Sequence, residues 1–450
     1  MKGLRTATLI FTMFFFFVGM PTFASEYKKG EVLVKYSSSS MLSSMVAEGM
    51  ESRPAVVAVD DTAEGIENFS DRGDVAYVEP NYLVEVEEVP SDWAYSSWQW
   101  VDTGLEDAWA HIGTDMGNEV VIALIDSGVD LDHPDLQNML VSGYDFINND
   151  SCPDDDYHHG TRVAGIIAAQ ANNDIAYAGV AWNIDVKIMP LKFLGSDGKG
   201  YISDAVDAIY YAVDHGADII NASWGFTSYS NALKDAIDYA RANGVLFIAS
   251  AGNSSQDNDE VAHYPSNFTM DNVIAVAAMN NYGDLASFSN YGYYSVDVAA
   301  PGQGLKTTDN DGGVCTWASG TSYAAPFVSA VAGMVISQSP ELGYNEVRDR
   351  IVRTSIIDGD DYTNILVDAG GCVNAYNAIT GEGVHDIADK SAWEAPATQK
   401  ADASSTAIAS NDSDGGAQCF VAAAGSPGYT WIFVLLMVTL SLMFRHGQRE

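Results

Sequence analysis

The order of apolar and polar positions predicts alternating strands and helices across most of the chain. Short, almost continuously apolar runs are typical of strands buried on both faces of a sheet. Such runs lie at 120–126, 185–193, 217–224, 245–253 and 272–278. Between and after them, apolar residues at helical spacing predict helices at 160–170, 202–216, 231–244 and 328–336. This alternation favours an α/β fold with a mostly parallel central sheet and helices on both faces.

A smaller unit precedes this region. The runs at 30–36 and 75–89 read as strands, and the residues between them can supply helices, so we expect a small α+β unit. Farther upstream, Lys2 and Arg5 precede an apolar stretch that ends at small residues. This pattern predicts a signal peptide at 1–24, cleaved after Ala24.

The C-terminal part of the chain changes in composition. Residues 381–428 are rich in Ala, Ser, Asp and Gly, which predicts a flexible linker. An apolar run follows at 429–444 and basic residues at 445–450. The run is short for a span, which needs about 20 residues. We expect a transmembrane or sorting segment, with the basic end in the cytoplasm.

The charge balance excludes one class of partner. The chain of 450 residues has 61 acidic and 21 basic side chains, a formal net charge of −40. Such a chain repels nucleic acid and anionic lipid, so we expect no nucleic-acid binding. Four cysteines occur. The predicted export leads to a compartment where a disulfide can form, but the sequence does not fix a pairing.

Four polar residues stand at predicted element ends. Asp126 ends one apolar strand, Asn253 ends another, and His159 and Ser322 precede helices. Taken singly, each is explained as a cap or a turn residue. Together they supply an orienting acid, an amide donor, a base and a nucleophile, and chemistry in parallel sheets collects at strand carboxyl ends.

Five stretches carry a family resemblance. "IALIDSGVDLDHPDL", "HGTRVAGIIAA", "INASWG", "ASAGN" and "SGTSYAAP" together resemble the subtilisin-like serine proteases, in particular the thermitase-like bacterial branch. The resemblance covers about residues 90–380 and has that family's order of Asp, His and Ser. It implies the subtilisin-like three-layer fold and a serine endopeptidase. Ser322 would be the nucleophile, His159 the base and Asp126 its orienting acid, with Asn253 and the Ser322 N–H binding the oxyanion.

The resemblance also implies where the substrate lies. An extended peptide would pair with protein strands, and a specificity subsite would hold the residue before the scissile bond. The residues implied are Gly198, Gly200, Ser223, Trp224, Gly225, Ser250, Ala251 and Gly252. We expect broad specificity led by large apolar residues. Asp257, Asp259 or Glu260 would add a secondary preference for Lys or Arg if a carboxylate points inward, and His263 is expected near the base of the subsite.

Two positions depart from the family pattern. His158 stands beside the base where the family usually has Gly, so it could crowd the imidazole or share protons with it. Tyr323 follows the nucleophile where the family usually has Met. We expect Tyr323 to remove the sensitivity to oxidation that Met gives.

Two loops resemble the family's calcium sites, and oxygen ligands of this number suit Ca²⁺. One set is Asp145, Asn148, Asp150, Asp154 and the carbonyl of Cys152; a solvated acidic turn is the alternative. The other set is Asp92, Asp135, Asn173 and the carbonyls of Ala171, Ile175 and Tyr177. We therefore expect Ca²⁺ at two structural sites. Zinc is not expected, since no Cys/His cluster has ligand spacing.

The resemblance assigns roles to the appended segments. Residues 25–88 would be an inhibitory propeptide, removed autocatalytically at a junction within 80–95 and followed by a catalytic domain at 89–380; a permanent N-terminal domain is the alternative. The tail would be recut by a sorting protease or would remain as a membrane anchor. The expected partners are polypeptide substrates, the propeptide, and the membrane or the sorting protease. We expect a monomer that is secreted or attached to the cell envelope.

Three alternatives remain open. The protein could be a dedicated processing protease with one substrate, or a calcium-dependent binding protein without activity on the same fold. The cysteines also allow more than one pairing. Cys152 and Cys315 each lie seven residues before a catalytic residue, so their segments could converge in a disulfide; Cys315–Cys372 is the main competitor.

Overall fold

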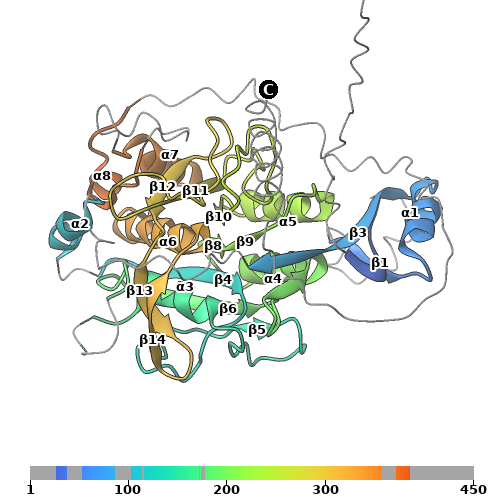
Figure 1. Cartoon of the computed structure of the whole chain (residues 1–450), viewed down its shortest axis with the longest axis horizontal. Helices are drawn as coiled ribbons and strands as arrows, with labels where there is room; N and C mark the ends of the chain where they lie inside the picture. The colour runs from blue at the N-terminus through green and yellow to red at the C-terminus, as the bar shows by residue number, and fades with distance from the viewer. Residues whose placement is uncertain are drawn as a thin grey trace, which may run out of the picture. The chain divides into compact units, whose positions relative to one another are not determined.

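The computed structural model of the whole chain (Figure 1) describes a defined part of it. The described ranges are 27–37, 53–86, 103–113, 116–171, 173, 178–356 and 371–385. All of them belong to one unit that extends to residue 403. The predicted signal peptide, most of the linker, the apolar run at 429–444 and the basic end lie outside the described residues.

A seven-stranded parallel sheet forms the centre of the fold. Its order is β12–β11–β10–β8–β4–β6–β5, and each neighbouring pair runs parallel. The strands are β4 (Val120–Asp126), β5 (Tyr144–Asp145), β6 (Val186–Lys192), β8 (Ile219–Ala222), β10 (Leu246–Ser250), β11 (Val273–Met279) and β12 (Val298–Pro301). The five predicted apolar strands are therefore confirmed, and β5 and β12 were not predicted.

Helices cover both faces of this sheet, as the sequence predicted. Helices α3 (His159–Ala168) and α6 (Thr321–Gln338) pack on one face, and α4 (Ile202–Asp214) and α5 (Asn231–Ala242) on the other. Strand β4 is apolar at every position before its last residue because its side chains enter the cores on both faces of the sheet. Ile122 and Leu124 join the core with α6, whereas Ala123 and Ile125 join the core with α4 and α5. The result is a three-layer α/β fold.

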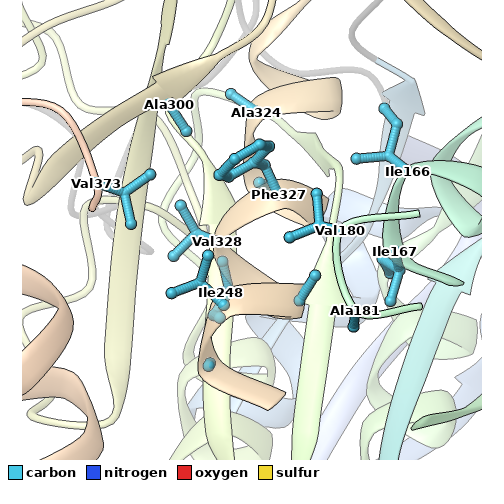
Figure 2. Close-up of a cluster of buried hydrophobic side chains, with 14 of the residues drawn as sticks. Ile166, Ile167, Val180, Ala181, Ile248, Ala300, Ala324, Phe327, Val328 and Val373 are labelled. Carbon is cyan, nitrogen blue, oxygen red and sulfur yellow. The ribbon is translucent and has the colours of Figure 1, made fainter. Parts of the chain in front are cut away.

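Helix α6 is buried along nearly its whole length. It is apolar on all sides, as expected for a helix enclosed by the rest of a domain. Figure 2 shows Phe327 and Val328 of α6, with Ala300 and Val373 on one side and Val180 on the other. The helix that carries the predicted nucleophile in its first turn is thus held by the core itself.

Smaller elements complete this part of the chain. Helices α2 (Leu105–Ile112), α7 (Tyr344–Arg353) and α8 (Ala375–Thr380) pack together beside α6. Strands β13 (Leu305–Asp309) and β14 (Gly313–Ala318) form a hairpin that packs on α3. Across the described residues, no helix is both long and apolar enough to cross a membrane.

The N-terminal unit has the predicted α+β character. Strand β1 (Tyr27–Tyr36) pairs antiparallel with β2 (Ala55–Ala58) and with β3 (Val75–Val86), and α1 (Thr62–Ser70) lies between β2 and β3 in sequence. Val32, Val34 and Val78 form a separate small core. Strand β3 then continues past this unit to the larger sheet region, where it pairs with β7 (Lys199–Tyr201) and β9 (Trp224–Gly225).

Candidate active site

The structure brings Asp126 and His159 into contact, although they are 33 residues apart. His159 Nδ1–H donates to both Asp126 carboxylate oxygens, at 2.8 and 3.0 Å. Both side chains are fully buried. Asp126 is the last residue of β4 and His159 the first of α3. Because a carboxylate holds Nδ1–H, the other ring nitrogen, Nε2, is the proton acceptor of the neutral imidazole.

A close approach of two backbone segments makes this contact possible. A Cβ on Gly160 would lie 2.0 Å from the carbonyl oxygen of Gly128, in the loop after β4. Any side chain at this position would therefore push α3 away from β4. The glycine directly after His159 is needed for the approach of the helix to the strand.

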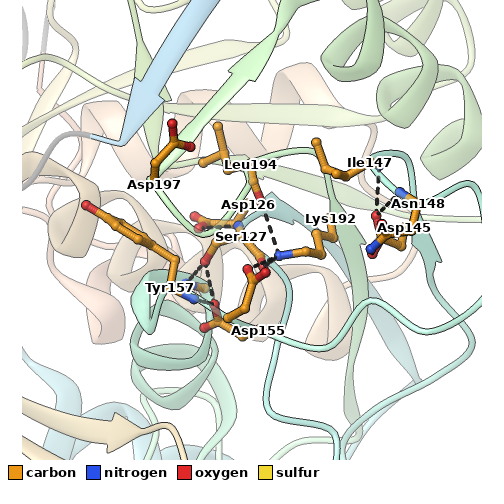
Figure 3. Close-up of polar contacts among 12 residues, drawn as sticks. Asp126, Ser127, Asp145, Ile147, Asn148, Asp155, Tyr157, Lys192, Leu194 and Asp197 are labelled. Atoms are coloured by element: carbon orange, nitrogen blue, oxygen red, sulfur yellow. Dashed lines mark hydrogen bonds and ion pairs between the residues drawn. The ribbon is translucent and has the colours of Figure 1, made fainter. Parts of the chain in front are cut away.

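The buried carboxylate of Asp155 organises the start of α3. It accepts hydrogen bonds from Ser127 Oγ, from the N–H groups of Tyr157 and His158, and from the N–H and Oγ1 of Thr161 (Figure 3). An anion at a helix N-terminus is stabilised by the helix dipole. Asp155 thus fixes the turn that presents His159, a role that sequence reasoning missed because its partners come from two separate segments.

Lys192 is a second residue that the sequence analysis missed. Its ammonium group is almost fully buried behind the loop that follows Asp126, and donates to the carbonyls of Ser127 (2.6 Å) and Leu194 (3.1 Å) and to Asp156 (2.5 Å) (Figure 3). A buried ammonium requires such partners. Lys192 therefore ties the end of β6 to the residue next to Asp126.

Ser322 lies in the first turn of α6, and its side chain is buried. The helix N-cap is Gly320, and no side chain caps this end. Ser322 is therefore not the cap that its position allowed. Its carbonyl oxygen accepts a hydrogen bond from Ser223 Oγ at 2.7 Å, which joins the nucleophile segment to the end of β8.

The side chain of Asn253 is oriented from the same helix end. Its Oδ1 accepts hydrogen bonds from the N–H of Thr321 at 2.8 Å and from Thr321 Oγ1 at 3.1 Å. Thr321 Oγ1 in turn accepts from the N–H of Gly252. With its oxygen held by Thr321, Asn253 directs its amide nitrogen away from that residue. The sequence offered no signal for this role of Thr321 beyond its place before Ser322.

The side chains at the two departures from the family pattern point to different partners. The ring of Tyr323 packs against the imidazole of His159, with centroids 5.3 Å apart, and Tyr323 is buried. His158 adopts a left-handed backbone conformation (φ 84°), and its Nδ1 lies 3.3 Å from Asp309. Its side chain is half exposed and is turned toward the β13–β14 hairpin. The ring of Tyr323 is thus one contact between α6 and His159.

An extended segment of the chain lies between the two strands predicted to hold a substrate. Residues 83–85 of β3 pair antiparallel with 199–201, and residues 85 and 86 pair with Gly225 and Trp224. Gly200 lies opposite residue 84, and Gly198 has φ 71° in the turn before β7. The end of the N-terminal unit thus occupies the position expected of a peptide substrate.

The predicted specificity subsite has walls formed by residues 223–225 and 250–252. Ser223, Ser250 and Ala251 are buried, as are both glycines that end these walls. His263 lies against both walls: a Cβ on Gly225 would meet its Cε1 at 2.1 Å, and one on Gly252 its Cδ2 at 3.3 Å.

In the loop after Asn253, the side chains of Asp257 and Asp259 accept hydrogen bonds from backbone N–H groups. Asp259 accepts from the N–H groups of Tyr294 and Ser295, and Asp257 accepts from the N–H of Asp259. Glu260 is exposed. These contacts remove the support for a secondary preference for Lys or Arg.

The two expected calcium loops differ in the structure. Asp135 is fully buried, burial raises its pKa, and its Oδ2 has no hydrogen-bond donor among the described residues. Its Oδ1 accepts from Asn173. This carboxylate fits a cation. Ala171 is described as well, whereas Asp92, Ile175 and Tyr177 lie outside the described residues.

In the 145–154 loop, the carboxylates of Asp145, Asp150 and Asp154 already accept hydrogen bonds from the protein. Asp145 accepts from the N–H groups of Ile147 and Asn148 and from Asn148 Nδ2 (Figure 3). Asp150 accepts from the N–H of Cys152, and Asp154 from a residue outside the loop, at 3.3 Å. No three acidic, His or Cys side chains of the described part of the chain are grouped to hold a metal.

The expected Cys152–Cys315 disulfide is not formed. No disulfide joins any two of Cys152, Cys315 and Cys372, so the Cys315–Cys372 alternative is not formed either. Cys315 pairs with Thr307 in the hairpin, and Thr307 Oγ1 donates to the carbonyl of Arg162, within α3. Cys152 is exposed in the loop after β5. The prediction was wrong because equal spacing before two catalytic residues does not make their preceding segments converge.

A buried carboxylate holds an imidazole at the carboxyl ends of parallel strands, beside a helix with a serine in its first turn. This is the arrangement of a serine hydrolase. The sequence matches the subtilase family over residues 117–381, more than half of the chain. The protein therefore belongs to the subtilase family. It is a serine endopeptidase of the subtilisin type, as its resemblance implied.

Three relatives show how far this similarity extends. A thermophilic serine proteinase of Bacillus sp. (strain AK1) is 40% identical over 68% of this chain and 73% of its own length. Thermitase of Thermoactinomyces vulgaris is 38% identical over 58% of this chain and 89% of its own length. A halolysin-like extracellular serine protease of Natrialba magadii is 34% identical over 64% of this chain and 53% of its own length.

Proposed function

We propose that the protein cleaves peptide bonds with Ser322 as nucleophile, His159 as general base and acid, and Asp126 as the group that orients the imidazole. The observation that carries this proposal is the buried contact between Asp126 and His159 Nδ1, next to helix α6, whose first turn holds Ser322. Ser322 Oγ attacks the peptide carbonyl while His159 accepts its proton. His159 then returns that proton to the leaving amine, and water releases the acyl group by the reverse sequence.

The negative charge on the tetrahedral intermediate needs donors. Asn253 Nδ2 and the backbone N–H of Ser322 are the two that we assign to it. Thr321 holds the amide oxygen of Asn253, so the nitrogen is oriented before substrate binds. Removal of one such donor typically lowers kcat by about 10²–10³.

A serine-directed fluorophosphonate tests this assignment. The probe should label the wild-type enzyme once per chain at Ser322, and the label should be absent from Ser322→Ala. Labelling at another serine, or no labelling of an enzyme that cleaves peptides, would overturn it.

We infer that the first 88 residues comprise an export signal and an inhibitory propeptide. Strand β3 supports this, because it lies between β7 and β9 as an inhibitory peptide would. Glu79 of the same strand caps the N-terminus of α5, and the Asn81 side chain contacts Ser203 at the start of α4. The name of the Natrialba relative describes an extracellular protease, which agrees with export. We propose a secreted or envelope-attached monomer.

We further propose that Ca²⁺ stabilises the enzyme. The site with Asp135 and Asn173 has the better support, since a buried carboxylate oxygen there has no hydrogen-bond donor among the described residues. The 145–154 loop is the second proposed site. Its support is weaker, because backbone N–H groups already contact Asp145.

For the substrate we propose broad specificity, with large apolar residues before the cut. Apart from Trp224, the residues assigned to the walls of this subsite are small (Ser223, Gly225, Ser250, Ala251 and Gly252), which suits a large apolar side chain between them. A dedicated processing role for one partner is the alternative. Digestion of a peptide library separates the two, since a dedicated protease would cut few sequences and a broad one would cut many.

A further inference from the structure

The ammonium group of Lys192 is directed at the backbone around the catalytic aspartate. Lys192 is the last residue of β6, and the parallel register places it opposite Asp126, the last residue of β4. All three N–H donors of the ammonium group have acceptors, which are the carbonyls of Ser127 and Leu194 and the carboxylate of Asp156 (Figure 3). The side chain is therefore held between the chain just after each strand and the segment that leads to α3.

The acceptors of Lys192, rather than the stability of the fold, account for a buried charge at this place. Removing a charge from water is costly, and apolar side chains that fill the same volume are often as stabilising as a buried ion pair. The acceptors, however, adjoin the catalytic segments. The N–H of Leu194 donates to the carbonyl of Asp126 at 3.2 Å. Asp156 lies three residues before His159.

Ser127 connects Asp126 and His159, the catalytic pair. Its N–H donates to Asp126 Oδ1 at 2.7 Å, and the same oxygen accepts His159 Nδ1–H at 2.8 Å. Ser127 Oγ accepts from the N–H of Gly160, the residue after His159, at 2.9 Å. Ser127 therefore contacts both segments of the catalytic pair, and its own carbonyl is the group that Lys192 holds, at 2.6 Å.

We propose that Lys192 is a positioning residue of the protease, which acts through Ser127 on the orientation of the catalytic pair. This inference rests on the proposed protease function and adds a residue to it. The imidazole must be aligned with Ser322 to accept its proton, and a misplacement of about 1 Å can lower a rate by about 10²-fold. Loss of the ammonium group frees the Ser127 peptide, and with it the N–H that orients the carboxylate.

The rate of reaction with a fluorophosphonate tests this proposal, because the reaction needs His159 to activate Ser322. In processed Lys192→Met every chain should still be labelled once, but the rate constant for labelling should be about 10–100-fold below the wild-type value. On a peptide substrate, kcat and kcat/KM should fall by the same factor while KM stays unchanged, as expected when substrate binding is intact.

A matched control separates this effect from the loss of any lysine in the strand. Lys187 lies near the other end of β6, where it forms an ion pair with Asp185, and Lys187→Met should be labelled at the wild-type rate. A merely structural role of Lys192 would lower the melting temperature or the labelled fraction of Lys192→Met and leave the rate constant unchanged. That result would overturn the proposal.

A double-mutant cycle tests the route through Ser127. Ser127→Ala removes the Oγ that accepts from Gly160, so the labelling rate should fall in this variant alone. The further loss caused by Lys192→Met should be smaller in Ser127→Ala than in the wild type, because part of what Lys192 holds in place is already lost. Losses that multiply in full would overturn the proposal.

The remaining outcomes distinguish this inference from the proposed function. If Lys192→Met does not fold, Asp156→Ala decides, because Asp156 is more than half exposed and its loss takes one acceptor from the ammonium group. Asp156→Ala should be labelled more slowly than the wild type, and a wild-type rate in that case would overturn the proposal. If the wild type is labelled and Lys192→Met reacts equally fast, only this inference fails. If the wild type is not labelled, the proposed function fails.

Discussion

Replacing Glu79 should weaken the hold of the propeptide on the enzyme. Its buried carboxylate accepts hydrogen bonds from Ser230 Oγ (2.5 Å), from the N–H groups of Asn231 (2.8 Å) and Ala232 (2.9 Å), and, at 3.4 Å, from Asn231 Nδ2. These donors lie at the N-terminus of α5, where the helix dipole favours an anion. Glu79 is thus the most densely bonded side chain described between the N-terminal unit and the enzyme's helices.

The size of the effect follows from these contacts. Each hydrogen bond to a charged group is worth roughly 1.5–3 kcal/mol, but burial of the carboxylate offsets much of the total. We therefore expect Glu79→Ala to weaken binding by about 3 kcal/mol, a factor of about a hundred in the dissociation constant. Glu79→Gln keeps one acceptor oxygen, so its dissociation constant should lie between those of the wild type and of Glu79→Ala.

The assay follows activity regained when the processed complex is diluted, which gives the dissociation constant of the cleaved propeptide. Glu67→Ala, an exposed carboxylate on α1, is the matched control and should behave like the wild type. If the dissociation constant of the Glu79→Ala propeptide is within threefold of the wild-type value, the contact with α5 does not hold the propeptide.

Three further outcomes are expected. Excess EDTA should lower the melting temperature, because a ligand at a hundred times its Kd stabilises by about 2.7 kcal/mol, and Asp135→Asn should remove most of that shift; an unchanged melting curve would exclude both calcium sites. Tyr323→Met should be inactivated by peroxide faster than the wild type, measured as residual activity after exposure. Burial raises the pKa of Asp204 to about 6, so its stabilising contribution is complete below the unfolded value near 4 and is lost as pH rises through 6. The melting temperature of the Ser322→Ala precursor should therefore fall between pH 5 and pH 7. It should fall by more than the melting temperature of the same precursor that also carries Asp204→Asn, and equal decreases would refute this prediction.

The sequence was most informative for residues whose position follows from the apolar pattern of one strand or helix. Asp126 was recognised because a buried strand ends there, and the structure ends β4 at the same residue. The apolar pattern also located α3, although it begins at His159 rather than one residue later. The β13–β14 hairpin was not predicted, because its polar and glycine-rich sequence, "LKTTDNDGGVCTWA", lacks the apolar period of a strand.

The supporting residues were hidden for a different reason. Asp155 and Lys192 act through contacts with segments 28 and 65 residues away, and nothing local distinguishes them from surface charges. His263, by contrast, was expected near the base of the specificity subsite, and it lies against Gly225 and Gly252. Side-chain direction in loops is set by long-range packing, which composition and periodicity do not encode.

The central claim is that one serine carries out both peptide cleavage and release of the propeptide. The most direct test expresses the full-length chain with Ser322→Ala and follows its length in purified, protease-free solution. Ser254→Ala, an exposed serine beside Asn253, serves as the control. We expect Ser322→Ala to remain uncut within 80–95 and to cleave no peptide, whereas the control is processed normally. Processing of Ser322→Ala at the wild-type rate would contradict the account.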